Sequence, residues 1–504
     1  MNLFDFNNKY PILNYFYLIT LLLNIFFAAS ILYDVFQIHI YRGDSFYYIP
    51  KYVAAYKLGA EGRWINHIFY PITTLISGKL LSLFMLLSFF YFIFINFYRW
   101  SKNFYYASLV SLLLFQIPPL YSQIMWPAVS VSAFLVLLLS IFFVQRLSIH
   151  LFYILFGILF FATMNNFYYL LPLLHLSLLT PNNSKENFRL FFFKIMPAWA
   201  IGFIVGYAVT QFIIYISSGH LMHIHSWRNP HYIHSIHDLI HNILNSLNFL
   251  ERDIKSIFSK NWMILVYFIT LFIAFKNRKK DLLWIPLVLF FLIIIVHYII
   301  AVPVGIDIAP RTIFATWIGI LAIVFFIPSV KQWQIFFLTP IIVFFTFTLY
   351  EKNHANLHWY SCISNTHFDN LLKESPKSSM QYKGVVLLAT NSNISKRNAL
   401  ISKQYNVQKD SNIEGFDHFT RWVPSALEAG FKSIIMCNES NELRERTDHF
   451  HRKTNINLIC QNVSKVYIKD DILLKNHSTF YNIYGEYNGR LIISFNKNWR
   501  NKDL

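Results

Sequence analysis

The sequence predicts a polytopic α-helical membrane protein that carries a water-soluble α/β domain at its C-terminal end. Of its 504 residues, 55% are hydrophobic and 19% are aromatic, a composition typical of lipid-facing helices and of the aromatic belts at their ends. Apolar segments follow one another almost without interruption from residue 12 to residue 349, and the rest of the chain is polar. We therefore assign residues 1–350 to a transmembrane domain and residues 351–504 to a soluble domain.

The apolar segments set the number of expected membrane spans. A helix needs about 20 apolar residues, each rising 1.5 Å, to cross the hydrocarbon core. Several candidates are shorter than this, so broken or tilted helices are expected there. About eleven candidates lie near residues 12–32, 80–98, 104–118, 128–144, 149–164, 167–179, 192–216, 262–275, 282–302, 313–328 and 335–349.

Basic residues in the gaps between the spans set the expected orientation. Short loops rich in Lys and Arg remain in the cytoplasm, and such residues fall in every second gap. The sequence thus predicts a cytoplasmic N-terminus and an external C-terminal domain. The net charge of +18 is divided between these gaps and the C-terminal domain, which favours a role in topology and solubility over nucleic-acid binding. The basic residues of the gaps are Arg99, Lys102, Arg146, Lys185, Arg189, Lys276, Arg278, Lys279, Lys280 and Lys331.

Two long external loops are expected, at residues 33–79 and 217–260. In each loop apolar residues recur at helical spacing, over Tyr47–Tyr56 and over Asp238–Ile257. Amphipathic helices of this kind are expected to lie in the membrane interface and to roof a cavity. Shorter external turns are expected at residues 118–127, 164–166 and 302–311.

The C-terminal domain alternates strand-like and helical segments. Short buried strands are predicted at Gly384–Leu388, Ser433–Cys437 and Ile456–Cys460, and a helix packed on them at Pro424–Phe431. The sequence of this domain contains neither a Gly-rich phosphate loop nor a nucleophile motif. We expect it to bind an acceptor or to form a lid, and not to carry the chemistry.

The first external loop holds the densest group of residues that could act in catalysis. Asp44 is followed by Tyr47, and Glu61 is followed by Arg63 and Trp64. A carboxylate can accept a proton from a hydroxyl nucleophile, a guanidinium can bind a phosphate through two parallel hydrogen bonds, and aromatic rings can stack on sugars. A structural role is the alternative: Asp44 would cap a helix beginning at Ser45, and Arg63 would extend to lipid headgroups.

Asp44 shortly after the first span, with Gly62-Arg63-Trp64 about twenty residues later, resembles the bacterial serotype-converting O-antigen glucosyltransferases. More broadly, the layout is similar to the GT-C class of membrane glycosyltransferases that use lipid-phosphate sugars. The resemblance covers the overall layout and roughly thirty residues. Members of the family often have paired acids where this chain has Gly43-Asp44, so a second carboxylate would come from Asp34, from Glu61 or from neither.

The resemblance implies a reaction and a location. A hexose, most simply glucose, would move from a polyprenyl-phosphate donor to a hydroxyl of lipid-linked O-antigen, at the outer face of the bacterial inner membrane. Asp44 would act as the base, with inversion at the anomeric carbon, and Arg63, Arg311 or Arg228 would hold the phosphate. Tyr47, Trp64 and Trp227 would contact the substrates. The implied reaction needs no cofactor and no metal, because the phosphodiester leaving group is already ionised.

The second external loop is rich in histidine. A metal site, a pH-sensitive polar surface and contacts to phosphate or sugar are all compatible with this spacing. No nearby Cys or Glu completes a metal site, so we assign no metal ligand. The histidines are His220, His223, His225, His231, His234, His237 and His241.

Two other functions remain as alternatives. An O-antigen polymerase or ligase is also a many-span enzyme, but it is expected to use external Arg and His and not an acid after the first span. A transporter of lipid or polysaccharide is expected to bury charges inside its spans. The predicted spans contain almost no ionisable residue apart from His175 and His297.

Overall fold

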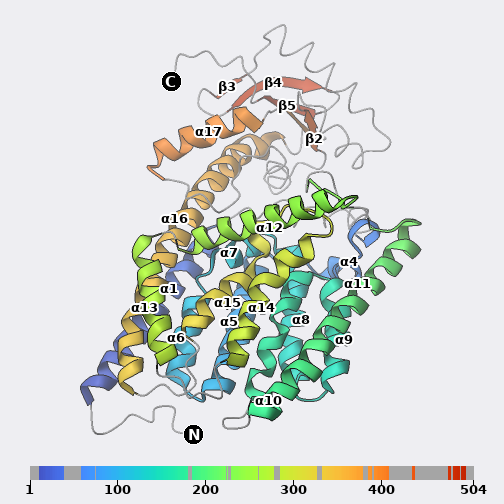
Figure 1. Ribbon diagram of the computed structural model, residues 1–504. Helices are drawn as coiled ribbons and strands as arrows, with labels where there is room; N and C mark the ends of the chain where they lie inside the picture. Colours follow the sequence, from blue (N-terminus) through green and yellow to red (C-terminus); the bar gives the residue numbers. More distant parts are fainter. Residues whose placement is uncertain are drawn as a thin grey trace. The chain divides into compact units, whose positions relative to one another are not determined.

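A computed structural model describes most of the helical part of the chain and part of the C-terminal region (Figure 1). It forms two compact units, one made of Met1–Leu32 and Ala54–Asn353 and the other of Tyr33–Val53 and His354–Leu504. The described residues are 11–38, 58–73, 75–179, 184–222, 224, 229–258, 260–276, 284–325, 332–378, 384–388, 391–407, 434–437, 475–477, 481–487 and 490–494.

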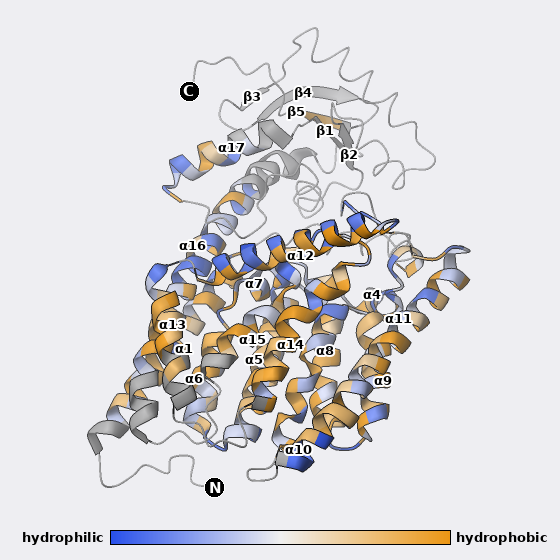
Figure 2. Cartoon of the chain, in the orientation of Figure 1, coloured by the Kyte–Doolittle hydropathy of each residue, from blue (hydrophilic) through white to orange (hydrophobic). Residues whose placement is uncertain are grey.

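The first unit is built from helices, most of them strongly apolar along their length (Figure 2). They are α1 (Pro11–Gln37), α4 (Trp64–Thr73), α5 (Gly78–Ser101), α6 (Phe104–Leu114), α7 (Pro118–Ile124), α8 (Pro127–Phe143), α9 (Ile149–Phe161), the 3₁₀ helix η1 (Asn165–Leu178), α10 (Ser184–Leu190), the π turn η2 (Phe191–Ile195), α11 (Met196–Ser218), α12 (Ile236–Ile257), α13 (Asn261–Lys276), α14 (Trp284–Ala301), the 3₁₀ turn η4 (Pro310–Thr312), α15 (Phe314–Phe325) and α16 (Gln332–Ser378). The last turn of α1 and the part of α16 from His354 onward belong to the second unit.

Among the described residues, three helical stretches are long and apolar enough to cross a membrane: Tyr15–Gln37, Gly78–Ser101 and Lys185–Ser218. The α6–α7 pair, bent by 64°, gives a fourth if it is counted as one broken span. Helices α8, α9 and α14 are apolar but shorter. The chain is therefore a helical protein of membrane-spanning composition, and the number of about eleven spans stays a prediction.

The bend between α6 and α7 follows from two consecutive prolines. Pro118 and Pro119 cannot donate a backbone hydrogen bond, so the helix ends before them and a new one begins there. The freed carbonyl of Phe115 accepts a hydrogen bond from the Tyr121 hydroxyl at 2.8 Å. The carbonyl of Gln116 accepts one from the Asn353 side chain at 2.6 Å. All residues of α7 are buried.

Glycines allow α9 and α11 to approach each other at backbone distance. A Cβ atom at Gly157 would lie 2.1 Å from the carbonyl oxygen of Gly202, and one at Gly206 would lie 2.6 Å from the backbone of Gly157. Gly202 and Gly206 are one turn apart on α11, the spacing that lets helix backbones meet in membranes. At the start of α11, the π turn precedes Pro197, which lacks an N–H for the regular helical ladder.

The second unit contains a five-stranded mixed sheet of order β2-β1-β5-β4-β3. Its strands are β1 (Gly384–Leu388), β2 (Ile434–Cys437), β3 (Lys475–His477), β4 (Tyr481–Tyr487) and β5 (Arg490–Ser494), and helix α17 covers Asn391–Gln404. β1 pairs in parallel with β2 and β5, whereas β4 is antiparallel to both β5 and β3. Strands β1 and β2 lie where strands are predicted; Ile456–Cys460 and Pro424–Phe431 lie outside the described residues.

Helix α16 differs from the sequence-based expectation. The predicted last span ends at residue 349 and the soluble region begins at residue 351, but the helix continues without a break to Ser378. The reason is local, because the sequence between these points has neither Gly nor Pro until Pro376. A change from apolar to polar composition alone does not end a helix.

Candidate functional site

The first turns of α8 are the point where several distant turns meet. The Arg311 guanidinium lies 5.4 Å from the ring centre of Trp126, the residue that precedes α8. The Gln123 side chain donates to the Met164 sulfur at 3.1 Å. Of the turns predicted to lie outside the membrane, the one at residues 118–127 therefore contacts both the turn at residues 164–166 and the turn at residues 302–311. The cationic Arg311 is positioned at the helix N-terminus by an aromatic face.

The end of the first external loop reaches the same helix. Arg63 Nε lies 2.8 Å from Glu61 Oε2, and each side chain is about one-fifth exposed. Between them, Gly62 has a φ of +66°, and a Cβ atom there would lie 2.5 Å from the Thr210 side chain of α11. Only glycine combines this backbone conformation with so close a contact. The turn thereby fixes the Glu61–Arg63 ion pair in place.

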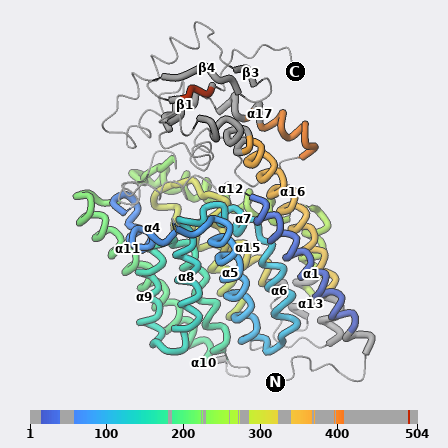
Figure 3. Tube along the Cα trace, turned by 180° about the vertical axis from the view of Figure 1, so that it is seen from behind, coloured from blue at the N-terminus to red at the C-terminus, as the bar shows by residue number. Residues whose placement is uncertain are grey.

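Helix α4 attaches this turn to α8. The Asn66 side chain donates to the Val129 carbonyl at 3.0 Å, and the Ser132 hydroxyl donates to the Asn66 side-chain oxygen. Asn66 is 2% exposed. Arg63 precedes Asn66 by about one helical turn. The hydrogen bonds between Asn66 and α8 therefore keep the part of the chain that carries the Arg63 guanidinium near α8. Figure 3 shows α4, α7 and α12 at one end of the first unit and α10 at the other.

Several buried polar atoms near this end of the bundle lack hydrogen-bond partners among the described residues. They are Trp64 Nε1, His67 Nδ1, Gln123 Oε1 and both side-chain polar atoms of Asn166. Leaving such a group unpaired costs about 1–3 kcal/mol, so each calls for an explanation. Indole, imidazole and amide groups together supply both donors and acceptors, which suits a ligand rich in hydroxyl groups.

The segment predicted as the second external loop is hydrogen-bonded to the turn that precedes Arg311. The backbone N–H of His231 donates to the Val304 carbonyl at 2.9 Å, and the Arg252 guanidinium donates to the Ile308 carbonyl at 2.9 Å. Both contacts tie the α12 segment to the residues just before Arg311. Helix α12 covers the segment Asp238–Ile257 where an amphipathic helix is predicted and begins two residues earlier, at Ile236.

The histidines of this loop form a polar network around the start of α12. His231 contacts Asn242 through Nδ1 at 3.0 Å and Asp238 through Nε2 at 3.6 Å. Hydrogen bonds from the Ser235 hydroxyl and the His234 backbone lower the pKa of the Asp238 carboxyl. Across the described ranges, no group of three His, Cys, Asp or Glu side chains could hold a metal ion; His223 and His225 lie outside these ranges.

The structure brings together some of the predicted site residues. Glu61, Arg63 and Trp64 are adjacent at the start of α4, and Arg311 reaches the same helix α8. Asp44, Tyr47, Trp227 and Arg228 lie outside the described residues. Asp34 belongs to the second unit, where its carboxylate is 2.6 Å from His354 Nδ1.

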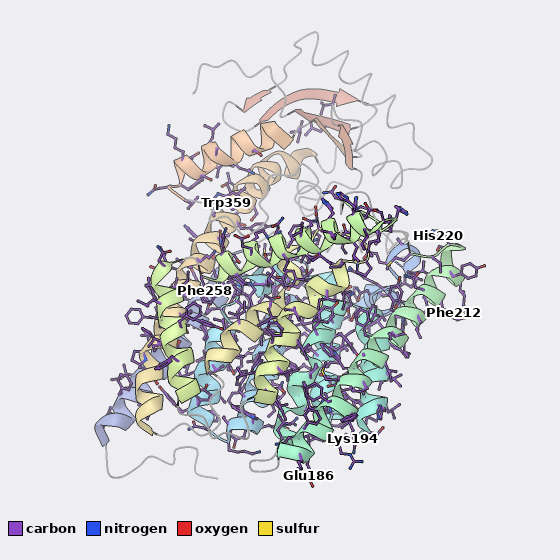
Figure 4. All side chains as sticks on the ribbon, in the orientation of Figure 1. Glu186, Lys194, Phe212, His220, Phe258 and Trp359 are labelled. Carbon is purple, nitrogen blue, oxygen red and sulfur yellow. The ribbon has the colours of Figure 1, made fainter. Side chains whose placement is uncertain are left out.

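Sequence reasoning missed Asn66, His67, Gln123 and Asn166 as site residues. Each is a polar residue next to apolar neighbours, which is a usable signal for a functional role in membrane segments. The opposite end of the first unit carries charged side chains. Figure 4 shows Glu186 and Lys194 at that end, far from His220.

Comparison with known proteins identifies no relative. No protein-family model matches the chain, and no curated protein or solved structure matches it at a significant level. The assignment of a function therefore depends on the geometry of the site and on the local sequence resemblance.

Proposed function

We propose that this protein is a membrane glycosyltransferase that moves a hexose from a polyprenyl-phosphate donor to a hydroxyl of a lipid-linked glycan. The observation that carries the proposal is the Glu61–Arg63 pair, which a glycine turn and Asn66 hold beside α8. Trp64 Nε1 and His67 Nδ1, which have no partner among the described residues, lie within about one helical turn of it along the chain, and Arg311 contacts the residue before α8. The similarity of the Asp44 and Gly62-Arg63-Trp64 segments to O-antigen glucosyltransferases, enzymes of the bacterial inner membrane, adds support.

The proposed reaction is a single displacement at the anomeric carbon. The acceptor oxygen forms a bond to this carbon, and the bond between the carbon and the phosphate oxygen breaks. The electron pair leaves with polyprenyl phosphate, whose charge a guanidinium stabilises. The acceptor proton passes to a carboxylate. Configuration inverts because attack and departure occur on opposite sides.

The Glu61–Arg63 ion pair gives Glu61 and Asp44 different roles. Glu61 Oε2 lies 2.8 Å from the Arg63 Nε atom, so the ion pair fixes the orientation of the guanidinium. A carboxylate in contact with a guanidinium is suited to orient it. We therefore assign Glu61 to the orientation of Arg63 and keep Asp44 as the base.

The test compares Asp44→Asn with Glu61→Gln in protein purified into lipid nanodiscs. Hexose transfer from polyprenyl-phosphate glucose to lipid-linked glycan is measured over a range of donor concentrations. Asp44→Asn is expected to abolish transfer with unchanged donor binding, whereas Glu61→Gln is expected to raise the KM for the donor. Near wild-type turnover by Asp44→Asn would reject the assigned base.

A second measurement tests the function without assuming the donor. The sugar composition and linkage of the O-antigen are compared between cells with and without the gene. Loss of one side-chain hexose supports the proposal. A change in chain length without a change in repeat-unit composition would instead support a polymerase or ligase, and accumulation of unmodified lipid-linked sugar at the cytoplasmic face would support a transporter.

A further inference from the structure

Helix α12 turns its polar side toward the protein and leaves an apolar side uncovered. Of its buried residues, three are polar: Asn242, Ser246 and Asp253. All but one of its exposed apolar residues, Leu239, fall on one side of the helix, mostly at intervals of three or four positions, and several are more than half exposed. These residues, here called the α12 stripe, are Ile236 (78% exposed), Ile240 (52%), Ile243 (41%), Leu244 (56%), Leu247 (53%) and Ile254 (37%).

Hydrogen bonds fix the helix in this rotation. The Asn242 side chain donates to the carbonyls of His231 at 2.8 Å and Val302 at 3.0 Å. The Tyr298 hydroxyl donates to the Asp253 carboxylate at 2.8 Å. With 3.6 residues per turn, the stripe is centred about 130° around the helix from this bonded side. The apolar residues therefore face away from the bonded side and cannot turn inward without breaking these bonds.

The stripe continues into other exposed apolar surface of the first unit. Helix α13 follows α12 directly and exposes Leu265 and Phe268, and α14, which contacts α12, exposes Ile299. Figure 2 shows α12, α13 and α14 on the same side of the bundle, with many hydrophobic residues along each. An apolar surface that spans three helices is typical of contact with lipid or with another protein.

We infer that α12 lies in the plane of the membrane surface, with its stripe in contact with lipid at the boundary between headgroups and acyl chains. This position follows from the stripe's continuity with α13 and α14, which are apolar throughout their length. Charge is not the attraction, because α12 contains three carboxylates, Asp238, Glu251 and Asp253, and two cations, Arg252 and Lys255. Burial of apolar side chains drives the contact. The inference is independent of the proposed glycosyl transfer.

The contact with lipid also sets the position of Arg311. Gly305, with a φ of +61°, leaves space for the Asn242 side chain, since a Cβ atom there would lie 2.5 Å from Asn242 Oδ1. The Arg252 guanidinium donates to the Ile308 carbonyl. Because α12 is bonded to both ends of this turn, the depth of the stripe in the membrane determines the depth of the Arg311 side chain.

Site-directed spin labelling tests the position of α12 in the full-length protein. Single cysteines replace Ile240 and Leu247 on the stripe, and Asn248 and Lys255 as exposed polar controls on the same helix, with Cys362, Cys437 and Cys460 replaced by serine. The labelled protein is placed in nanodiscs of phosphatidylethanolamine and phosphatidylglycerol. The measurement is the collision rate of each label with oxygen, which concentrates in lipid, and with a nickel chelate, which remains in water.

Labels at 240 and 247 are expected to collide several-fold more with oxygen than with the nickel chelate, with the reverse at 248 and 255, in low and high salt alike. Equal access of all four labels to the nickel chelate would overturn the inference, because the stripe would then face water. Protection of 240 and 247 from both reagents would also overturn it, since another protein surface would cover the stripe. Bimane at the same cysteines, quenched by spin-labelled lipids, gives a second readout in which only quenching at 240 and 247 supports the inference.

Discussion

The α9–α11 contact and the N-terminal end of α8 pack helices in opposite ways. At α9–α11, glycines bring backbones together, and the polar groups nearby are paired: the Tyr168 hydroxyl donates to the Trp199 carbonyl at 2.6 Å, and Tyr153 bonds His175 at 3.0 Å. At the end of α8, Asn166 and Gln123 are equally buried but retain unpaired atoms. The comparison separates a contact whose polar groups are paired from one that retains unpaired groups, and the proposed ligand site is at the second.

Adding one methyl group to the α9–α11 contact should have the largest effect on stability. Gly202→Ala places a Cβ atom 2.3 Å from the Tyr153 carbonyl oxygen, so the two backbones must separate, at a cost of about 3 kcal/mol. The measurement is thermal unfolding in detergent. Gly59→Ala is the matched control, because its nearest contact is an ordinary 3.4 Å. Equal melting temperatures for the two variants would show that the contact is not tight.

Removing the Arg63 guanidinium, which precedes α4, should weaken binding of the donor and leave folding intact. Arg63→Gln is expected to lose a charge-assisted bond of about 1.5–3 kcal/mol, which raises the KM for a lipid-phosphate donor by roughly 10- to 100-fold. Arg63→Lys retains the charge without the planar fork and should fall between. Lys194→Gln, at the opposite end of the first unit, is the control for loss of a cation. An equal loss of use of donor and acceptor would count against phosphate recognition.

Replacing an unpaired amide should separate stability from activity. Asn166→Leu removes a buried group without partners, so stability is expected to stay constant or rise by about 1 kcal/mol while transfer falls. Asn242→Leu is the matched comparison, because its amide donates two hydrogen bonds and its loss should destabilise the protein. Unfolding temperature and transfer rate are measured on both variants. Destabilisation by Asn166→Leu would mean that the amide has a structural role.

The smallest expected effect is a pH dependence at the start of α12. Because hydrogen bonds lower the pKa of folded Asp238, its contribution to stability is present above the unfolded pKa of about 3.9 and is lost as the pH falls through the lower folded value. The difference in unfolding temperature between wild type and Asp238→Asn should be constant from about pH 5 to pH 7 and should shrink below about pH 4. A difference that persists at lower pH would exclude this origin.

The sequence predicts elements where the signal is local. The amphipathic period over Asp238–Ile257 locates α12, and Pro118-Pro119 marks the break before α7. Asn488-Gly489, between β4 and β5 in the sequence, is a dipeptide typical of a β-hairpin turn. Local signals also place Glu61 and Arg63 near each other, since they are two residues apart.

Contacts between distant segments are beyond this kind of reasoning. Asn66 is recognised as a link only because it meets Val129 across the fold, and the unpaired state of Asn166 depends on the arrangement of its neighbours. Packing decides both of these features. The length of α16 has a local cause instead, because no Gly or Pro ends the helix where the sequence becomes polar.

The paired prolines before α7 have a mechanical consequence. A break in a helix inside an apolar bundle is often a hinge, but here Tyr121 and Asn353 occupy the carbonyls that the break releases. Swinging α7 would take the hydrogen-bond donors away from two buried backbone oxygens, at about 1–3 kcal/mol each. The bend between α6 and α7 is therefore rigid, and it keeps Trp126, with the Arg311 guanidinium over its ring, in a fixed position.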